Sequence, residues 1–487
     1  MIFELSFRKE VSAVLFSSSV FLFAFLPVVL LGYYVVMRGM RRRQNLFLLI
    51  SSLFFYAWGE PRFVLVMLLS IWMNYGFGRW VHRRKRQCRY LTLPIAVSAG
   101  CNLGLLFVFK YLAFTVESLN TLGLGLQVPV IELPIGISFF TFQALSYVLD
   151  VAMDRAEVQR SPLDLGLYIS FFPQLIAGPI VKYADVAGQI AHRQETWADF
   201  SEGCVRFLTG LGKKVLIANQ AAVVADRVFA MDPAGLSVPL AWLGSLCYTF
   251  QIYYDFSGYS DMAIGLGLMF GFRFRENFEH PYAARSISEF WRRWHISLST
   301  WFRDYVYIPL GGNRVERGKH IRNLFLVWLL TGIWHGANWT FVLWGLLYFC
   351  LLYLEKFRRL GKNWPAPFQW AGTFLAVNFL WMLFRADTLS YAGQFFLAMM
   401  GLNGSGGDGG LSGLHLRENA VILALAVFFS FPTAQALGKA FRRLRPFGLD
   451  LSPLWDLLYA LGLTAVGVLS VCWLVKGTYN PFIYFHF

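Results

Sequence analysis

The sequence predicts an all-α protein that crosses a membrane several times. Of its 487 residues, 57% are hydrophobic and only 15% are charged, and the mean hydropathy is +0.50. A soluble domain usually carries about 25% charged residues. Several stretches also approach the roughly 20 apolar residues that a helix needs to cross a bilayer. The clearest of these are residues 16–37, 63–80, 91–108, 238–270 and 454–475.

The first apolar stretch is expected to remain in the protein as its first span. It is longer than the hydrophobic region of a signal peptide, and no small-residue cleavage site follows it before Arg38. Residues 1–14 form an N-terminal leader to which we assign no role. Residues 15–487 are expected to form a single membrane domain.

The basic residues indicate the orientation of the chain. The net charge of +15 comes from 43 Lys and Arg against 28 Asp and Glu. Short basic runs alternate with apolar stretches, and the positive-inside rule places such runs in the cytoplasm. A nucleic-acid-binding protein would gather them in one domain with stacking aromatic residues, so we expect no nucleic-acid partner. The main runs are residues 38–43, 79–89, 314–322, 356–362 and 439–445.

Two segments are predicted to face the opposite side of the membrane. The sequence GEPR, residues 59–62, interrupts the apolar region between Arg43 and Arg79, so two short spans with GEPR outside fit the flanking charges best. The glycine-rich loop GLNGSGGDGGLSG, residues 401–413, contains no Lys or Arg. It is therefore assigned to the outer face.

The segment between Arg322 and Lys356 is predicted to be a hairpin or a re-entrant turn. A single helix would leave one of the flanking basic runs on the wrong side. The turn would lie near TGIWHGANW, residues 331–339, deep in the protein. Non-helical backbone is tolerated there only where protein or a water-filled cavity surrounds it, and Gly336 is expected to supply the backbone freedom.

His335, within this turn, is the strongest catalytic candidate. A neutral imidazole can accept a proton from a hydroxyl as a general base, and polar groups at membrane depth are costly enough to suggest a function. Trp334 lies beside it and, like Asn338, is kept as a candidate substrate-binding residue. Asn338, one helical turn away, is expected to orient the ring or a substrate carbonyl. The alternative is a packed histidine that bonds a neighbouring carbonyl.

Residues 285–322 mix charged and aromatic side chains and are predicted to form helices that lie along or dip into the cytoplasmic surface. His295 either helps to hold a substrate or bonds Ser299 on its own helix. Arg292 and Arg293 suit a phosphate-bearing ligand, because guanidinium binds phosphate in a fork geometry; interfacial snorkelling is the alternative. The predicted substrate-binding residues in this stretch are Arg292, Arg293 and Trp294.

Two carboxylates lie in the apolar sequence YYDFSGYSDMAIGLG, residues 253–267. Each would cost roughly 2.5–3.5 kcal/mol at the centre of a membrane helix, so Asp255 and Asp261 are expected to face protein and pair with an Arg or a hydroxyl. Asp261 is also kept as a candidate substrate-binding residue. A triad of Ser257, His335 and Asp261 stays open, although no GxSxG elbow supports it.

The six cysteines are scattered and include no CxxC pair. They indicate neither a zinc site nor a disulfide framework. Packing in the apolar core is their expected role, and no metal site is expected.

Six segments together resemble the membrane-bound O-acyltransferase family. The resemblance runs from about Leu15 to the last residue, and it is strongest with the branch that O-acetylates bacterial polysaccharides such as alginate. Residues 285–354 carry its two Trp-His motifs. The six segments are PIGISFFTFQALSYVLDV (134–151), FFPQLIAGPI (171–180), YYDFSGYSDMAIGLGLMFGF (253–272), FWRRWHISLSTWFRDYVYIPLGGNR (290–314), GIWHGANWTFVLWG (332–345) and the final NPFIYFHF.

The resemblance implies a ring of about ten or more transmembrane helices, with re-entrant and interfacial helices around a central funnel or tunnel. Funnels from both faces would meet at the essential histidine, which maps onto His335, and His295 maps onto the second motif histidine. An acetyl group, with acetyl-CoA as the expected donor and no bound cofactor, would enter from the cytoplasm. It would leave on the far side of the bacterial inner membrane.

The resemblance also implies partners and leaves two alternatives. A separate extracytoplasmic acetyltransferase usually completes the transfer to the polysaccharide acceptor in such systems. One alternative is acyl or D-alanyl transfer to another cell-envelope glycan such as teichoic acid, with a carrier protein as donor. The other is a channel or transporter without catalysis, in which the polar centre only lines a path.

Overall fold

The computed structural model describes residues 16–404, 407–443, 450–477 and 479–480, and these residues form helices and loops without a strand. The predicted all-α class is confirmed. Within these residues, five helices are long and apolar enough to cross a membrane, whereas the expectation of about ten or more spans stays a prediction. The five are Val64–Arg86, Thr92–Asn120, Trp339–Arg358, Leu411–Ser430 and Ser452–Val475. The leader at residues 1–14 and the final residues 481–487 lie outside the described part.

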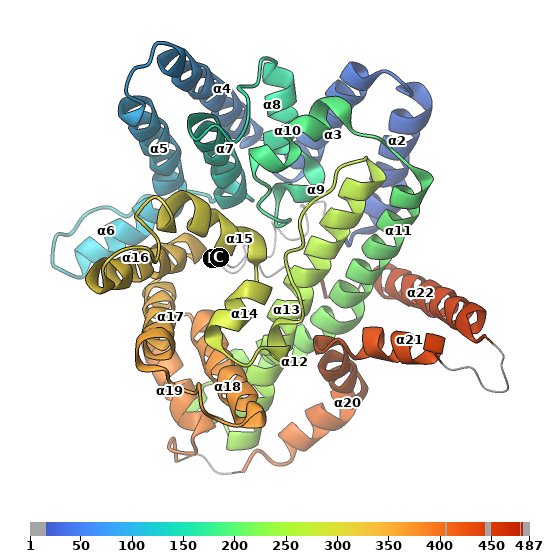
Figure 1. The fold of residues 1–487 in the computed structure, drawn as a ribbon. Coiled ribbons are helices and arrows are strands. Elements are labelled where there is room, and N and C mark those ends of the chain that lie inside the picture. Colours follow the sequence, from blue (N-terminus) through green and yellow to red (C-terminus); the bar gives the residue numbers. More distant parts are fainter. Residues whose placement is uncertain (1–15, 405–406, 444–449, 478, 481–487) are drawn as a thin grey trace.

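The N-terminal helices form one side of the molecule, coloured blue to green in Figure 1. The predicted hairpin around GEPR is present, because α3 (Arg41–Gly59) and α4 (Val64–Arg86) flank a short turn. The predicted span at 91–108 is longer than expected and continues to Asn120. The elements before and after this hairpin are η1 (Phe21–Phe25), α2 (Leu26–Leu31), η2 (Gly32–Val36), α5 (Thr92–Leu106), η3 (Phe107–Tyr111), α6 (Leu112–Asn120), α7 (Ile137–Ala152), α8 (Pro162–Ser170), α9 (Phe172–Leu175) and α10 (Tyr183–His192).

The long helix α13 (Val238–Met269) is buried around almost its whole circumference. It packs against α11 (Trp197–Gly212), η4 (Lys213–Ala218) and α12 (Asn219–Phe229). Its two carboxylates are paired, as expected for charges in apolar surroundings. The predicted arginine is present at Asp261, whereas the partner of Asp255 is a lysine. Asp255 lies 2.7 Å from Lys214 Nζ, and Asp261 lies 2.7 Å from Arg206 and 2.6 Å from Lys213.

The remaining helices extend around the centre of the view, where the short helices α14 (Ile287–Arg293) and α15 (Ile296–Phe302) lie (Figure 1). The first part of the stretch predicted to follow or dip into the cytoplasmic surface has buried aromatic side chains, from Phe290 to Tyr305. Its second part, residues 306–322, is mostly half-buried or exposed. Its position relative to the membrane stays a prediction. The other elements are η5 (Pro233–Gly235), η6 (Pro281–Ala283), η7 (Arg303–Tyr307), α16 (Arg317–His335), α17 (Trp339–Arg358), α18 (Ala366–Arg385), α19 (Leu389–Met399), α20 (Leu411–Ser430), α21 (Thr433–Arg443) and α22 (Ser452–Val475).

The hairpin predicted between Arg322 and Lys356 is confirmed by α16 and α17, which pack together and are separated by residues 336–338. The expected reason for Gly336 is wrong. Its φ of −169° and ψ of 160° are extended values that any residue adopts. A Cβ at this position would lie 2.1 Å from the Phe341 ring, so the glycine is required by space and not by backbone freedom.

The cysteines correct another expectation. All six are free thiols, but only Cys247 is buried; Cys204 is half-buried, and the other four are exposed. Cys88 lies in the basic loop after α4, whereas Cys101, Cys350 and Cys472 lie on helices, where a lipid-facing surface is as apolar as a protein core. An apolar sequence context therefore does not distinguish the two locations.

Candidate active site

His335 is the last residue of α16, and its side chain is enclosed by aromatic rings. The centroid of its ring lies 5.1 Å from Trp334, 5.0 Å from Trp344 and 5.1 Å from Phe384. The residue is 8% exposed, and its Nε2 has no hydrogen-bond partner among the described residues. Buried polar atoms are nearly always hydrogen-bonded, so a buried nitrogen without a partner is an exception. We interpret this nitrogen as available to a substrate group.

The end of α16 is held by two side chains from the span 92–120. Lys110 Nζ donates to the carbonyl oxygens of Trp334 at 2.8 Å and His335 at 3.0 Å, and the Tyr111 hydroxyl donates to Ile333 O at 2.8 Å. These carbonyls have no partner within the helix, because the last turn of a helix leaves its acceptors open. Our sequence analysis missed Lys110, although a single lysine inside the apolar run LLFVFKYLAF was a visible signal.

His295 is fully buried and precedes α15, with a positive φ of 43°. Its Nδ1 lies 3.2 Å from Asn277 Oδ1, and the backbone N–H of Ser297 donates to the same oxygen at 3.1 Å. A backbone N–H can only donate, so this atom of Asn277 is the acceptor oxygen. The Ser297 hydroxyl lies 3.3 Å from Nδ1 but donates its one hydrogen to the same Asn277 oxygen at 2.9 Å. This leaves Nδ1 as the donor to Asn277. In the neutral ring Nε2 is therefore a proton acceptor, and it has no partner within the described chain.

These contacts correct the predicted partner of His295. The hydroxyl of Ser299 donates to Trp291 O at 3.3 Å instead of bonding the imidazole. Our sequence analysis also missed Asn277, which lies 18 positions before His295 in a loop. No local pattern marked this residue, because only the fold of the loop before α14 brings it to the ring.

The two Trp-His motifs meet at Trp334. Its ring centroid lies 6.1 Å from that of His295 and 5.1 Å from that of His335. Phe139 and Phe142 of α7 pack against the same indole. The structure thus brings together His295, Trp334 and His335, although 40 positions separate the two histidines.

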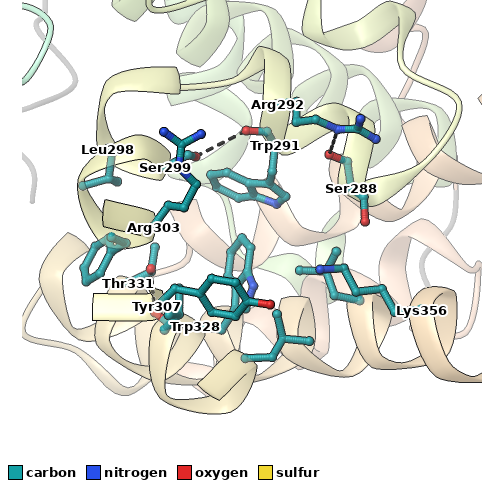
Figure 2. A pocket seen from close by; sticks show the side chains of 14 residues that line it. Ser288, Trp291, Arg292, Leu298, Ser299, Arg303, Tyr307, Trp328, Thr331 and Lys356 are labelled. Atoms are coloured by element: carbon teal, nitrogen blue, oxygen red, sulfur yellow. Dashed lines mark hydrogen bonds between the residues drawn. The ribbon is translucent and has the colours of Figure 1, made fainter. Parts of the chain in front are cut away.

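A cavity of about 430 Å³ lies beside these motifs, between α14, α15, η7, α16 and α17. Figure 2 shows three cationic side chains around it, those of Arg292, Arg303 and Lys356. Its walls include Trp291, Trp328 and Tyr307. The cavity therefore combines positive charge with aromatic surface, which suits a ligand with phosphate groups and an apolar arm.

The α16 residues that line this cavity share a helix face with His335, although neither His335 nor His295 lines the cavity itself. Leu324, Trp328 and Thr331 all line the cavity. They are spaced by four and three residues, so they share one face of the helix. Four residues after Thr331, the next position on that face is His335.

Arg293 and Trp294, two of the predicted binding residues, contact other protein side chains instead of the cavity. Arg293 forms an ion pair with Glu289 at 2.6 Å, whereas Arg292 lines the cavity and bonds Ser288 O at 3.2 Å. Trp294 is buried, with its ring 5.0 Å from Phe278 and 4.8 Å from Trp381. Neither Arg293 nor Trp294 lines the cavity.

Asn338 and Asp261 also have other partners than those expected. Asn338 caps α17, since its Oδ1 accepts from Thr340 N at 3.0 Å and its Nδ2 donates to Asp387 O at 2.8 Å. It therefore does not orient His335. Asp261 bonds Arg206 and Lys213, and Ser257 Oγ has no partner in the described part of the chain. The open possibility of a Ser257–His335–Asp261 triad is thus not supported by these contacts.

A known protein family and several individual proteins are similar to this chain. A model of the membrane-bound O-acyltransferase family matches residues 62–391. The chain is 42% identical to "Probable alginate O-acetylase AlgI" of Pseudomonas putida, over 97% of this chain and 100% of that protein. It is 38% identical to the peptidoglycan O-acetyltransferase of Helicobacter pylori over 81% of each chain. It is 31% identical to the teichoic acid D-alanyltransferase of Bacillus subtilis over 50% of this chain and 64% of that protein.

Proposed function

Because this chain belongs to the membrane-bound O-acyltransferase family and is a multi-pass membrane enzyme, we propose that it moves an acetyl group from cytoplasmic acetyl-CoA across the membrane. The acetyl group serves the O-acetylation of an exported polysaccharide such as alginate. One observation carries this proposal. It is the cavity lined by Arg292, Arg303 and Lys356, one wall of which is the face of α16 that also carries His335.

The cationic side chains support a donor that carries phosphate groups. Arg292, Arg303 and Lys356 suit the phosphates of CoA, because guanidinium groups bind phosphate in a fork geometry and lysine binds it as a point charge. The apolar and aromatic walls suit the pantetheine arm. The thioester of a donor bound in this way would extend toward His335.

The proposed reaction uses His335 as the general base. As the acceptor hydroxyl attacks the thioester carbonyl, Nε2 takes the hydroxyl proton; the new C–O bond forms and the C–S bond breaks. The leaving thiolate then receives a proton and departs as CoA. His295, whose Nε2 is also an acceptor, is the second proposed catalytic residue, on the donor side.

The acceptor side of the proposal involves another protein. An extracytoplasmic acetyltransferase would receive the acetyl group or present the polysaccharide, with this chain in the bacterial inner membrane. The similarity to alginate O-acetylase covers 97% of this chain, and the similarity to the teichoic acid D-alanyltransferase covers 50%. Acetyl transfer is therefore favoured over D-alanyl transfer.

The proposal is tested with purified protein, radiolabelled acetyl-CoA, the partner acetyltransferase and the glycan. An enzyme releases CoA in proportion to the acetylated product. A channel or transporter releases none, so a silent assay with the partner present would contradict the proposal. Parallel reactions with a D-alanyl carrier protein as donor separate the two acyl groups.

The first prediction concerns His335→Gln. Glutamine keeps hydrogen-bonding capacity and approximate size but cannot accept the proton, and general base catalysis contributes roughly a hundredfold to ten-thousandfold. We expect acetylation to be lost with little change in expression or thermal stability. The measurement is the O-acetyl content of the secreted glycan. Asn338→Ala is the matched control: it removes the cap of α17 but no contact to His335, so it should retain most of the activity. Near-normal transfer by His335→Gln would overturn the catalytic assignment.

A further inference from the structure

We propose that Lys110 is a positioning residue that fixes the end of α16 and thereby the ring of His335. This inference rests on the proposed acyl transfer, because it assigns a role relative to the proposed base. The lysine comes from η3, 225 positions before His335. It belongs to the span 92–120, which the cavity lining does not include.

The first step is a count of hydrogen-bond donors. A lysine ammonium has three N–H donors and no acceptor. Lys110 Nζ lies 2.8 Å from Trp334 O, 3.0 Å from His335 O and 3.3 Å from Ser138 Oγ. All three donors are therefore used within the protein. A group without a free donor is suited to hold the backbone and not to bind the substrate.

The second step is the charge. Among the described residues Lys110 forms no ion pair with a carboxylate, and its neighbours on the helix are apolar. What it meets instead is the C-terminal end of α16, which carries the negative end of the helix dipole and open carbonyls. Its Nζ also lies 5.8 Å from the centroid of the Trp334 ring. The cation and the helix end thus compensate each other in apolar surroundings.

The third step connects this contact to His335. The helix ends at His335, and the next residue, Gly336, is extended, so no further helical turn restrains the imidazole. Lys110 bonds the carbonyl of His335 itself and that of Trp334, the indole between the two histidines. Without these bonds the last turn of α16 is free to shift, and a displacement of about 1 Å can cost about a hundredfold in rate.

The experiment compares Lys110→Met with Tyr111→Phe. Methionine keeps the length of the side chain without its donors, and we expect kcat for acetyl transfer to fall at least about tenfold while the KM for acetyl-CoA changes little. Tyr111→Phe removes one neutral bond to the same helix end, at Ile333 O. It should retain most of the activity. Size-exclusion profiles and thermal unfolding show whether each variant is folded.

A rescue experiment separates positioning from a general loss of stability. In a background without the native cysteines, Lys110→Cys is alkylated with 2-bromoethylamine, which forms a lysine analogue of nearly equal length. Mass spectrometry measures the extent of alkylation. We expect activity to return with the aminoethyl group but not with methyl methanethiosulfonate, which adds a neutral group to the same sulfur.

The outcomes are distinct. Wild-type kcat in Lys110→Met, an equal loss in Tyr111→Phe, or equal rescue by the neutral group would overturn the inference. If Lys110→Met aggregates, the alkylated and unalkylated forms of the folded Lys110→Cys variant decide between these results. If the wild-type protein makes no acetylated product, the proposed function itself is contradicted. If the wild-type protein and the Lys110→Met variant are both fully active, only the role of Lys110 is contradicted.

Discussion

At the scale of single residues, the protonation of His295 follows from a backbone amide. The N–H of Ser297 fixes the orientation of the Asn277 amide, and the amide oxygen then fixes the hydrogen on Nδ1 of the ring. The Ser297 hydroxyl donates to the same oxygen at 2.9 Å. One loop residue thus leaves Nε2 as the acceptor, in the way that a carboxylate sets the tautomer of a histidine in a catalytic triad.

This arrangement predicts that Asn277→Ala reduces acetyl transfer by roughly a hundredfold, because the ring loses its orientation and its preferred tautomer. His295→Ala is the reference and should abolish turnover or raise the apparent donor requirement while the protein stays monodisperse. Steady-state kinetics against acetyl-CoA measure both effects.

Thr300→Ala is the control for these variants, because Thr300 lies on the same short helix α15 but bonds Ile296 O and does not line the cavity. It should retain activity. Full activity of Asn277→Ala beside an inactive His295→Ala would show that the tautomer is not set by the amide. Aggregation of His295→Ala would favour the structural role of that histidine.

At the scale of helices, the hairpin of α16 and α17 is held by close backbone contact. A Cβ on Gly345 would lie 2.5 Å from Trp328 O, and one on Gly332 would lie 2.5 Å from Phe341 O. Helices in membranes associate through such small residues, because lipid is as apolar as leucine and supplies no hydrophobic drive. The hairpin therefore depends on the absence of two side chains.

Gly345→Ala is predicted to destabilise this hairpin, because its Cβ would press on a backbone oxygen that cannot rotate away. Overpacking of this kind costs about 1–3 kcal/mol, so we expect a lower midpoint of thermal unfolding in detergent and reduced acetyl transfer. Gly393→Ala in α19 is the matched control, since a Cβ there has no neighbour within 4 Å.

The control variant should be neutral or slightly stabilising, because alanine favours the helix over glycine by about 1 kcal/mol. An unchanged midpoint in Gly345→Ala would mean that the two helices can separate at little cost. That result would contradict the dependence of the hairpin on close contact.

At the scale of the whole molecule, each of two helical hairpins gathers basic residues at its own open end. Arg83, Arg84, Lys85 and Arg86 occupy the last turn of α4, and α3 begins at Arg41. Lys356 and Arg358 occupy the last turn of α17, and α16 begins at Arg317. Both pairs of antiparallel helices therefore agree with a cytoplasmic location of these ends.

The topology prediction uses two single-cysteine proteins. Cys88 is native and exposed in the basic loop after α4, and Gly413 lies exposed near the start of α20, after the glycine-rich loop. In spheroplasts, an impermeant thiol reagent should label Gly413→Cys but should label a protein that retains Cys88 alone only after permeabilisation. Labelling of Cys88 in sealed spheroplasts would refute the cytoplasmic assignment.

The sequence by itself determined what depends on local composition. Length and apolarity predicted the helices, and the charges on both sides of residues 323–355 predicted the hairpin and the depth of His335. The cost of a carboxylate among apolar residues likewise predicted that Asp255 and Asp261 would be paired. In each case the free energy depends on whether a group meets water, lipid or protein, and a short window of sequence contains that information.

The tertiary structure alone decided which distant groups share a contact. Asn277 reaches His295 through a loop, and Lys110 reaches the end of α16 from another span, so neither partner follows from spacing along one helix. The same holds for the cysteines, since lipid and core are equally apolar, and for Gly336, whose need is set by the Phe341 ring. Hydrogen bonds and close contacts act over a few ångströms in space. The residues that make them here are far apart in the sequence, and only the packing of the helices brings them together.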